Sequence, residues 1–441
     1  MGIININHNL FWSILGRLIG ILALISINSI AAKNLNIEDF AFFNLILSII
    51  PSSFIFLTFG QDLASSKFLS MYEDKDVHKL NVIKVFLLIF FIGSIPIILF
   101  FNKIVDFFRG SMTLTLSFIL IIIFSSVLRI LSDYLRANNN FKYFILFNSI
   151  RSSGGLIIWS LFLLQIILLL LFQFFSLETI FYSLAFSCFS ALFLLLGIKR
   201  SIVFNFLNKK FSLFKIDKQF KVYFKSSLFI ASSSFLVMLK SDYDAWIVSA
   251  FGGTNELAFY APVIKIAVLI MVPLSIFESL MPKNISLYYH SKDRRSLENY
   301  IRSINTYMFY CSFLLLVVLL IFSKSVLLIL FGEKFIHLDL VLKCVILSFL
   351  PKILLGPCGQ ILILTKYEKI NLFVNLFFLI SSVILGIILT NHFGYYGMIA
   401  TYMMGIILIN ITFYIFVLKK LKINTLPYFN FLKVDFTTLN K

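Results

Sequence analysis

Residues 10–32 read LFWSILGRLIGILALISINSIAA, a run in which Arg17 is the only charged residue. A helix needs about 20 mostly apolar residues to cross a bilayer, so this run predicts a membrane-spanning helix. It lacks the basic region and the small-residue cleavage site of a signal peptide, and we interpret it as a retained first helix. A charge at bilayer depth costs roughly 2.5 to 3.5 kcal/mol on insertion scales, so Arg17 indicates that this helix faces a cavity, a pore or a partner.

Apolar runs of this length fill most of the chain and define its class. Hydrophobic residues make up 60% of the 441 residues and charged residues only 13%, which excludes a soluble protein of this size. The mean hydropathy is +0.97. We predict an all-α polytopic membrane protein with about twelve transmembrane helices. They lie near residues 10–32, 40–60, 82–101, 112–132, 144–172, 178–198, 223–250, 257–280, 303–323, 338–364, 370–390 and 394–418.

Two of these segments are irregular. The segment 144–172 is too long for one straight span and contains Arg151, Gly154 and Gly155, so it tilts, breaks or begins as a cytoplasmic extension. The segment 338–364 contains Gly356 followed by Pro357, which predicts an interrupted helix. The ends of both segments stay open at this point.

The distribution of positive charge predicts the orientation. With both termini in the cytoplasm, the cytoplasmic loops and tail hold roughly 25 Lys and Arg, whereas the outer side holds about five. The outer residues are Lys33, Lys103, Arg109, Lys324 and Lys334. The formal net charge of +18 is therefore a topology signal rather than evidence for a nucleic-acid partner. Basic cytoplasmic loops also suit contact with anionic membrane lipids.

The chain reads as two halves joined by a basic loop. The longest hydrophilic stretch, residues 199–225, falls at the midpoint of the sequence, where it suggests a hinge. Residues 39–43 (DFAFF) match residues 256–260 (ELAFY) weakly, at an offset of about 217 residues. We predict an N-terminal six-helix bundle over 1–200, a cytoplasmic basic linker over 201–222, a C-terminal six-helix bundle over 223–420 and a cytoplasmic tail over 421–441.

The region between the seventh and eighth predicted helices carries Asp242, the loop 251–256 (FGGTNE) and then Ala258-Phe259-Tyr260. This order resembles the polysaccharide (O-antigen, Wzx-type) flippase family, which typically has an Asp in the helix, a short Gly-containing loop and then Gly-x-Tyr. Here Ala stands in place of the Gly. The first half is similar, with Glu38 and Asp39 before the second helix. The family belongs to the multidrug/oligosaccharidyl-lipid/polysaccharide exporter superfamily.

This resemblance implies the MATE-like/MurJ-like exporter fold, in which two six-helix bundles surround a central cavity. It also implies a function: a flippase that moves an undecaprenyl-diphosphate-linked oligosaccharide from the inner to the outer leaflet of the bacterial cytoplasmic (inner) membrane. Such a protein serves the biosynthesis of O antigen, lipopolysaccharide, capsule or another surface polysaccharide. Its implied partners are a polysaccharide polymerase and a chain-length regulator. The identity of the glycan and the oligomeric state stay open.

The charges inside the predicted helices agree with an anionic substrate. A lipid diphosphate that crosses the membrane needs cationic groups at depth, because they replace its lost hydration. Four basic residues meet this requirement and are our candidate substrate-binding residues, forming a cationic ladder along a path. They are Arg17, Lys240, Lys265 and Lys352.

Most of these cations have a structural explanation beside the functional one. Arg17 lies in a small-xxx-small packing pattern and is equally able to pair with Asp62. Lys240 has Asp244 one turn later on the same face, which allows a self-contained ion pair. Lys265 has no acidic residue one turn away in its helix. The break beside Lys352 flanks a binding site or serves packing alone.

Four acidic residues lie at comparable positions: Asp62, Asp242, Asp244 and Glu278. They are candidates to bind a coupling ion, sodium or a proton, and they serve equally well as counter-ions of the lysines. The driving force stays open between sodium, proton and membrane potential.

Other classes of protein fit less well. The five histidines and four cysteines show no metal or redox spacing, and no phosphate-binding loop or nucleophile elbow is present. We therefore predict a transporter rather than an enzyme, with no cofactor and no metal. Two alternatives remain: a cation-coupled multidrug or toxin extruder of the same superfamily, and a membrane glycan polymerase or ligase. The cationic surplus argues against the first, and the short outer loops argue against the second.

Overall fold

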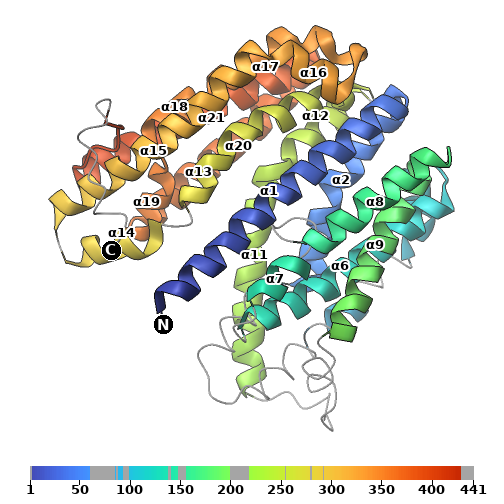
Figure 1. The fold of residues 1–441 in the computed structure, drawn as a ribbon, viewed down its shortest axis with the longest axis horizontal. Coiled ribbons are helices and arrows are strands. Elements are labelled where there is room, and N and C mark those ends of the chain that lie inside the picture. Colours follow the sequence, from blue (N-terminus) through green and yellow to red (C-terminus); the bar gives the residue numbers. More distant parts are fainter. Residues whose placement is uncertain are drawn as a thin grey trace. The chain divides into compact units, whose positions relative to one another are not determined.

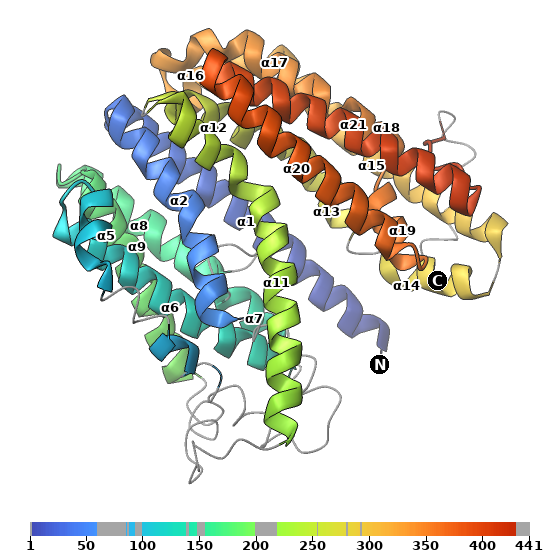
Figure 2. The ribbon, with the colours of Figure 1, turned by 180° about the vertical axis from the view of Figure 1, so that it is seen from behind.

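The computed structural model describes residues 2–59, 85, 88–92, 99–137, 141–147, 155–198, 218–253, 255–278, 281–291 and 293–428. Within these ranges every regular element is a helix (Figures 1 and 2). Six helical segments there are long and apolar enough to cross a membrane. They are Met112–Asp133, Leu177–Ile198, Glu256–Ser275, Arg294–Ile321, Glu368–Phe393 and Tyr395–Leu421. The chain is an all-α polytopic membrane protein, as the sequence predicted.

The described helices of the first half range from seven to 33 residues in length. They are α1 (Gly2–Asn34), α2 (Ile37–Thr58), α5 (Phe101–Phe107), α6 (Met112–Ala137), α7 (Phe141–Phe147), α8 (Leu156–Leu171), α9 (Leu177–Ile198) and α11 (Lys218–Ile247). The predicted span 82–101 and the linker 201–222 lie largely outside the described residues. The predicted division at that linker therefore stays a prediction.

The second half contains more interruptions. A π-helix (Val248–Gly252) is followed by α12 (Glu256–Ala267), a 3-10 turn (Val268–Ile270), α13 (Met271–Glu278), α14 (Met281–His290) and α15 (Arg294–Ile321). Then come α16 (Ser323–Phe331), the 3-10 helix η3 (Glu333–Leu338), α17 (Asp339–Ser348), α18 (Leu350–Leu355), α19 (Cys358–Leu364), α20 (Glu368–Phe393) and α21 (Tyr395–Leu421).

The chain forms two compact units. Unit 1 comprises residues 1–39 and 46–242, and unit 2 comprises residues 40–45 and 243–441. In unit 1, α9 packs against both α6 and α8, and α8 packs against α1 (Figure 1). The segment 144–172 is broken rather than straight, because Gly155 adopts a left-handed φ of 79° at the start of α8.

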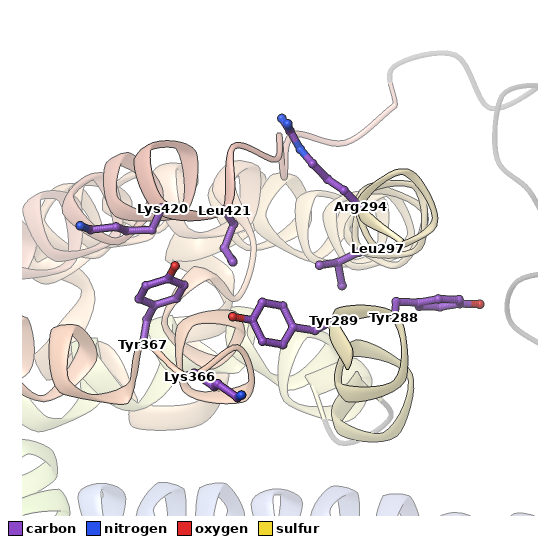
Figure 3. A pocket seen from close by; sticks show the side chains of 8 residues that line it. All are labelled: Tyr288, Tyr289, Arg294, Leu297, Lys366, Tyr367, Lys420 and Leu421. Carbon is purple, nitrogen blue, oxygen red and sulfur yellow. The ribbon is translucent and has the colours of Figure 1, made fainter. Parts of the chain in front are cut away.

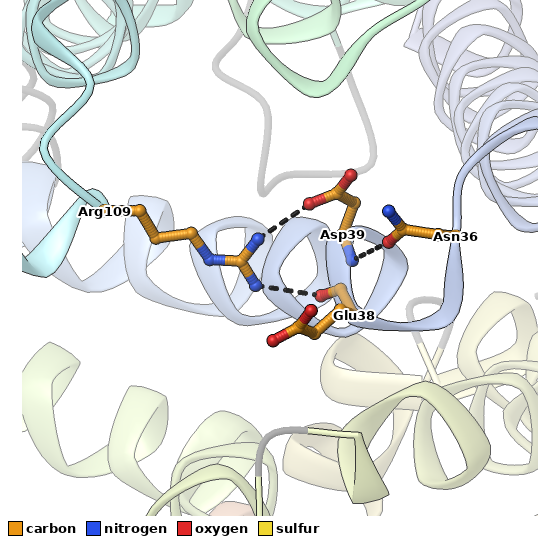
Figure 4. Close-up of polar contacts among 4 residues, drawn as sticks. All are labelled: Asn36, Glu38, Asp39 and Arg109. Atoms are coloured by element: carbon orange, nitrogen blue, oxygen red, sulfur yellow. Dashed lines mark hydrogen bonds and ion pairs between the residues drawn. The ribbon is translucent and has the colours of Figure 1, made fainter.

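One polar contact in unit 1 ties the α5–α6 turn to the start of α2 (Figure 4). Arg109 Nη1 donates to Asp39 Oδ1 at 2.7 Å, and Nη2 donates to the Glu38 carbonyl at 3.2 Å. Asn36 Oδ1 accepts the Asp39 N–H at 2.7 Å, which satisfies one of the free donors of the first turn of α2. The Asp39 carboxylate therefore has a structural role at this helix end, whereas Glu38 takes part through its backbone carbonyl.

Unit 2 is built around the antiparallel pair α20 and α21, which lie side by side in both views (Figures 1 and 2). The predicted interruption of helix ten is confirmed: α18 ends at Leu355, Gly356 has a φ of 73°, and α19 begins at Cys358. The residues after α21 do not leave the bundle at once. Ile423 and Thr425 are fully buried, and Thr425 Oγ1 donates to the Leu355 carbonyl at 2.6 Å.

Candidate functional site

A buried carboxylate lies at the end of α11. Asp244 is 7% exposed, and its Oδ2 accepts the hydroxyl of Tyr260 at 2.6 Å. Its Oδ1 accepts the N–H of Ala245 at 2.9 Å. Tyr260 comes from α12 and is 2% exposed, so this hydrogen bond joins two helices inside unit 2. A buried polar group that has partners is tolerated at low cost, and these contacts hold the carboxylate in one place.

Two further tyrosines surround this carboxylate. Tyr243 and Tyr402 lie close enough to Asp244 to interact with its charge. Tyr243 also forms a side-chain hydrogen bond with Ser382 on α20. The result is a cluster of phenols around one acid, which we call the Asp244 cluster. Phenol hydroxyls both donate and accept, so the cluster offers several sites for a proton or a small cation.

The second polar centre of unit 2 is Lys265 on α12. Its ammonium donates to Asn44 Oδ1. The Nδ2 of Asn44 donates to the Phe40 carbonyl at 2.8 Å, which fixes the amide so that its oxygen faces the lysine. Asn44 is 4% exposed and belongs to unit 2, although it lies in α2. A neutral amide orients an ammonium without neutralising its charge.

Sequence reasoning identified Lys265 but missed Asn44. The available signal was an asparagine inside an apolar run, because polar residues at bilayer depth usually have a partner or a function. The helix geometry around Lys265 is also irregular. Pro262 lies inside α12, and the helix tightens into the 3-10 turn directly after Ala267. Short stretches of this kind often mark hinges.

Lys352 lies in the first part of the broken helix ten, α18, and Glu278 contacts its second part, α19. Lys352 is half-buried in α18, and its carbonyl accepts the N–H of Gly356 at 3.0 Å. Its charge lies close enough to Cys358 for an electrostatic interaction across the break. Glu278 is half-buried at the end of α13, and its carbonyl accepts Nε2 of Gln360 at 3.0 Å.

The remaining candidates are less defined. Asp62 lies outside the described residues, and the side chain of Arg17 is likewise undescribed although its helix is. Lys240 is exposed on α11 and Asp242 is half-buried. Arg17 and Lys240 belong to unit 1, whereas Lys265 and Lys352 belong to unit 2. The cationic ladder therefore stays a prediction. Among the described residues, no group of three His, Cys, Asp or Glu side chains is arranged to hold a metal ion.

The fold is that of the MATE transporters. One similar solved structure is described as the inward-facing conformation of a multidrug resistance MATE family transporter of the MOP superfamily. It matches with a TM-score of 0.64 and 14% identity over 91% of this chain and 94% of the other. The outward-facing conformation of such a transporter matches with a TM-score of 0.63 and 13% identity over 94% and 95%.

A third similar structure is a MOP superfamily transporter from Pyrococcus furiosus, for which a reversed polarity of the binding pocket suggests a different function. It matches with a TM-score of 0.62 and 12% identity over 94% of this chain and 95% of the other. No family model matches the sequence. No curated protein matches it either. At these identities the likeness establishes the fold, and membership of the O-antigen flippase family stays a prediction.

Proposed function

We propose that this protein is an alternating-access flippase for undecaprenyl-diphosphate-linked oligosaccharide repeat units. It works in a bacterial cytoplasmic membrane with both termini in the cytoplasm and supplies O-antigen, capsule or another surface polysaccharide. A polymerase and a chain-length regulator then use the translocated unit. The MATE fold supports the transport mode, since similar chains have been solved in inward-facing and outward-facing conformations.

The observation that carries the choice of substrate is the Lys265–Asn44 pair. Lysine is rare inside membrane helices, and such residues usually line a substrate path or cavity. The Asn44 amide accepts a hydrogen bond from this ammonium and orients it. An ammonium held in this way attracts a diphosphate and repels an organic cation. Arg17, Lys240 and Lys352 are proposed to serve the same anionic path.

The irregular helices of unit 2 supply the movement in this mechanism. The 3-10 turn after α12 begins three residues after Lys265, and the break at Gly356 lies four residues after Lys352. Such points absorb backbone rotation without unfolding the flanking helices. The diphosphate binds the cations in the inward-open state, the prenyl tail stays in lipid, and rocking of the bundles exposes the headgroup on the other side. Substrate shifts this equilibrium only as far as it binds one state better.

A cation-coupled multidrug extruder is the second candidate. It is favoured by the solved structures above, two of which are described as multidrug resistance transporters. The Asp244 cluster is the feature of this chain that fits it, because a buried carboxylate ringed by phenols suits a proton or a small cation. Asp62, Asp242 and Glu278 are further candidates for this role. In the flippase proposal, the same cluster couples ion movement to transport.

Deletion of the gene combined with leaflet-selective labelling of lipid-diphosphate-linked glycan tests the proposal. The flippase predicts glycan trapped in the inner leaflet and loss of surface polysaccharide. Normal surface glycan with raised sensitivity to cationic drugs would instead support the extruder.

Two substitutions then test the Lys265–Asn44 pair. Lys265→Met keeps the side-chain length without the charge, and Asn44→Asp keeps the shape but adds a counter-charge. Both should abolish complementation while membrane insertion is retained. The matched control is Lys324→Met, because Lys324 is exposed in α16. Full complementation by both variants would refute the role of this lysine.

A further inference from the structure

A cavity of about 380 Å³ opens in unit 2 (Figure 3). Neither Lys265 nor a residue of the Asp244 cluster lines it. Its volume falls within the range of about 300 to 1,000 Å³ that small-molecule sites occupy. We call it the basic pocket. It is lined by Tyr288, Tyr289, Arg294, Leu297, Lys366, Tyr367, Lys420 and Leu421. No step of the proposed transport mechanism uses these residues.

The pocket combines an apolar interior with a cationic edge. Tyr289, Tyr367 and Leu421 turn toward one another across its middle, whereas the charged ends of Lys420, Lys366 and Arg294 point outward from it on different sides (Figure 3). Leu297 is 3% exposed and lines the pocket. Within the part of the chain that the structure describes, none of these three cations takes part in an ion pair. Their charge is therefore available to a ligand.

The nearest acidic residue in sequence is already engaged. Asp293 caps α15 by accepting the N–H of Ser296 at 3.0 Å and its hydroxyl at 2.6 Å. These hydrogen bonds hold the pKa of the Asp293 carboxyl below its usual value. The carboxylate thus serves the helix end, and the neighbouring Arg294 is left to face solvent.

The backbone at Lys366 adds a second observation. The Tyr367 N–H donates to the Leu362 carbonyl at 2.9 Å, and Lys366 has a left-handed φ of 66° between them. This is the helix-ending turn in which glycine normally occupies the left-handed position. Here that position carries a long cationic side chain instead. A strained non-glycine residue at the edge of a cavity is a reason to look for function there.

The position of the pocket along the helices identifies its surroundings. Two candidate membrane spans contribute lining residues from their ends, since α15 begins at Arg294 and α21 ends at Leu421. Lys366 and Tyr367 directly precede a third span, α20. We therefore place the pocket at the level of the lipid headgroups. Tyrosine and lysine are the residues that prefer this level. The positive charge at these ends also marks the predicted cytoplasmic face, where the leaflet is rich in anionic lipids.

From this arrangement we infer that the basic pocket binds the phosphate headgroup of an anionic phospholipid of the inner leaflet. On binding, the long side chains of Arg294, Lys366 and Lys420 turn inward from the rim to surround the phosphate, and the Tyr367 hydroxyl donates to one of its oxygens. Leu297 and Leu421 contact the glycerol and the upper acyl chains. The site is independent of the transported substrate, so it holds for a flippase and for an extruder alike.

The chain offers a matched pair of variants for the test. The pocket variant carries Arg294→Gln, Lys366→Gln and Lys420→Gln. The control variant carries Arg295→Gln, Lys369→Gln and Lys419→Gln, which remove the same charge at positions one to three residues away in sequence. Arg295, Lys369 and Lys419 are exposed and do not line the pocket. Each full-length protein is placed in nanodiscs of phosphatidylcholine with or without phosphatidylglycerol, and retained lipids are counted by native mass spectrometry.

We expect wild type and the control variant to retain phosphatidylglycerol and the pocket variant to lose it. Each basic residue near an anionic surface contributes about fivefold in affinity, so three account for about a hundredfold. Equal retention of phosphatidylglycerol by all three proteins would overturn the inference. Equal loss from both variants would also overturn it, because the lipid would then respond to the total charge and not to the pocket. Thermal unfolding in phosphatidylcholine alone checks that both variants are folded.

A test with inorganic phosphate distinguishes a site for a lipid headgroup from a site for soluble phosphate. It is added to wild type in phosphatidylcholine nanodiscs, and the midpoint of thermal unfolding is measured. A ligand that binds only the folded state raises this midpoint. We expect no rise with phosphate and a rise with phosphatidylglycerol. A rise with phosphate that is as large would mean a soluble-phosphate site and overturn the assignment to lipid.

Discussion

Replacing Gly356 by alanine perturbs the break of helix ten at a single atom. Gly356 has a φ of 73°, and a Cβ added there would come within 2.5 Å of Asn305 Oδ1 and 2.7 Å of its Cγ. Asn305 is fully buried in α15. Its Nδ2 donates to the Leu354 carbonyl at 3.0 Å and to the Thr425 carbonyl at 2.6 Å. The amide cannot move aside without losing these bonds.

The expected cost follows from two contributions. Gly356 has φ 73° and ψ −164°, a region that essentially only glycine occupies and that costs other residues on the order of 1 to 3 kcal/mol. Displacing the Asn305 amide loses two buried hydrogen bonds, at about 1 kcal/mol each. Gly356→Ala should therefore destabilise the protein by about 3 to 5 kcal/mol. It should also loosen the segment 422–428 from α15, because Asn305 is one of the groups that hold Thr425.

Thermal unfolding of the purified protein measures this cost, with Gly197→Ala as the control. Gly197 lies in α9, has no left-handed φ and has no heavy atom within 4 Å of an added Cβ. Its replacement should be neutral or should stabilise by about 0.5 to 1 kcal/mol, as in other helices. Gly356→Ala should instead lower the midpoint by several degrees.

A double variant separates the clash from the backbone term. Asn305→Ala removes the atoms that the new Cβ meets. In that background, Gly356→Ala should cost only the free energy of the unfavourable backbone conformation at residue 356. The two costs should then be non-additive by about 2 kcal/mol. Additivity within about 0.5 kcal/mol would refute the argument, because it means that the two side chains do not meet.

Three further predictions concern single contacts. Arg109→Ala should cost less than about 1 kcal/mol in a thermal unfolding assay, because its ion pair with Asp39 is partly exposed. Tyr260→Phe should cost about 1 to 3 kcal/mol, since it leaves the buried Asp244 with one hydrogen bond fewer, and it should reduce coupled transport. For Asp293, whose pKa is lowered in the folded state, the cap stabilises at neutral pH, and this contribution disappears as the pH falls through the lowered pKa. In the Asp293→Asn variant, the free energy of unfolding should accordingly fall less steeply as the pH is lowered.

The span positions could be predicted because bilayer thickness dictates helix length. The segments predicted near 370–390 and 394–418 are α20 and α21, with ends within about three residues of the prediction. The break at Gly356 was also predictable, since glycine followed by proline removes a backbone donor and relaxes the dihedral restraint. These features depend on residues that are adjacent in sequence.

Features that depend on distant partners could not be predicted. α16 spans only nine residues and lies where the sequence indicated an outer loop, because a short apolar stretch carries no span-length signal. The docking of residues 422–428 depends on Asn305 and Leu355, which lie 120 and 70 residues from Thr425. The composition of residues 422–428 does not indicate that Asn305 and Leu355 are their hydrogen-bond partners.

The Lys265–Asn44 pair at the candidate site also depends on residues that are distant in sequence. The two residues are 221 positions apart, so periodicity and spacing cannot associate them. Two charges of the candidate site have a neutral hydrogen-bond partner: Lys265 has an amide and Asp244 has a phenol. A buried pair of opposite charges satisfies itself and responds weakly to a ligand, whereas a charge oriented by a neutral group keeps its field. Transport of an ion or a diphosphate requires the second arrangement, because the protein must exchange its own contacts for those of the cargo.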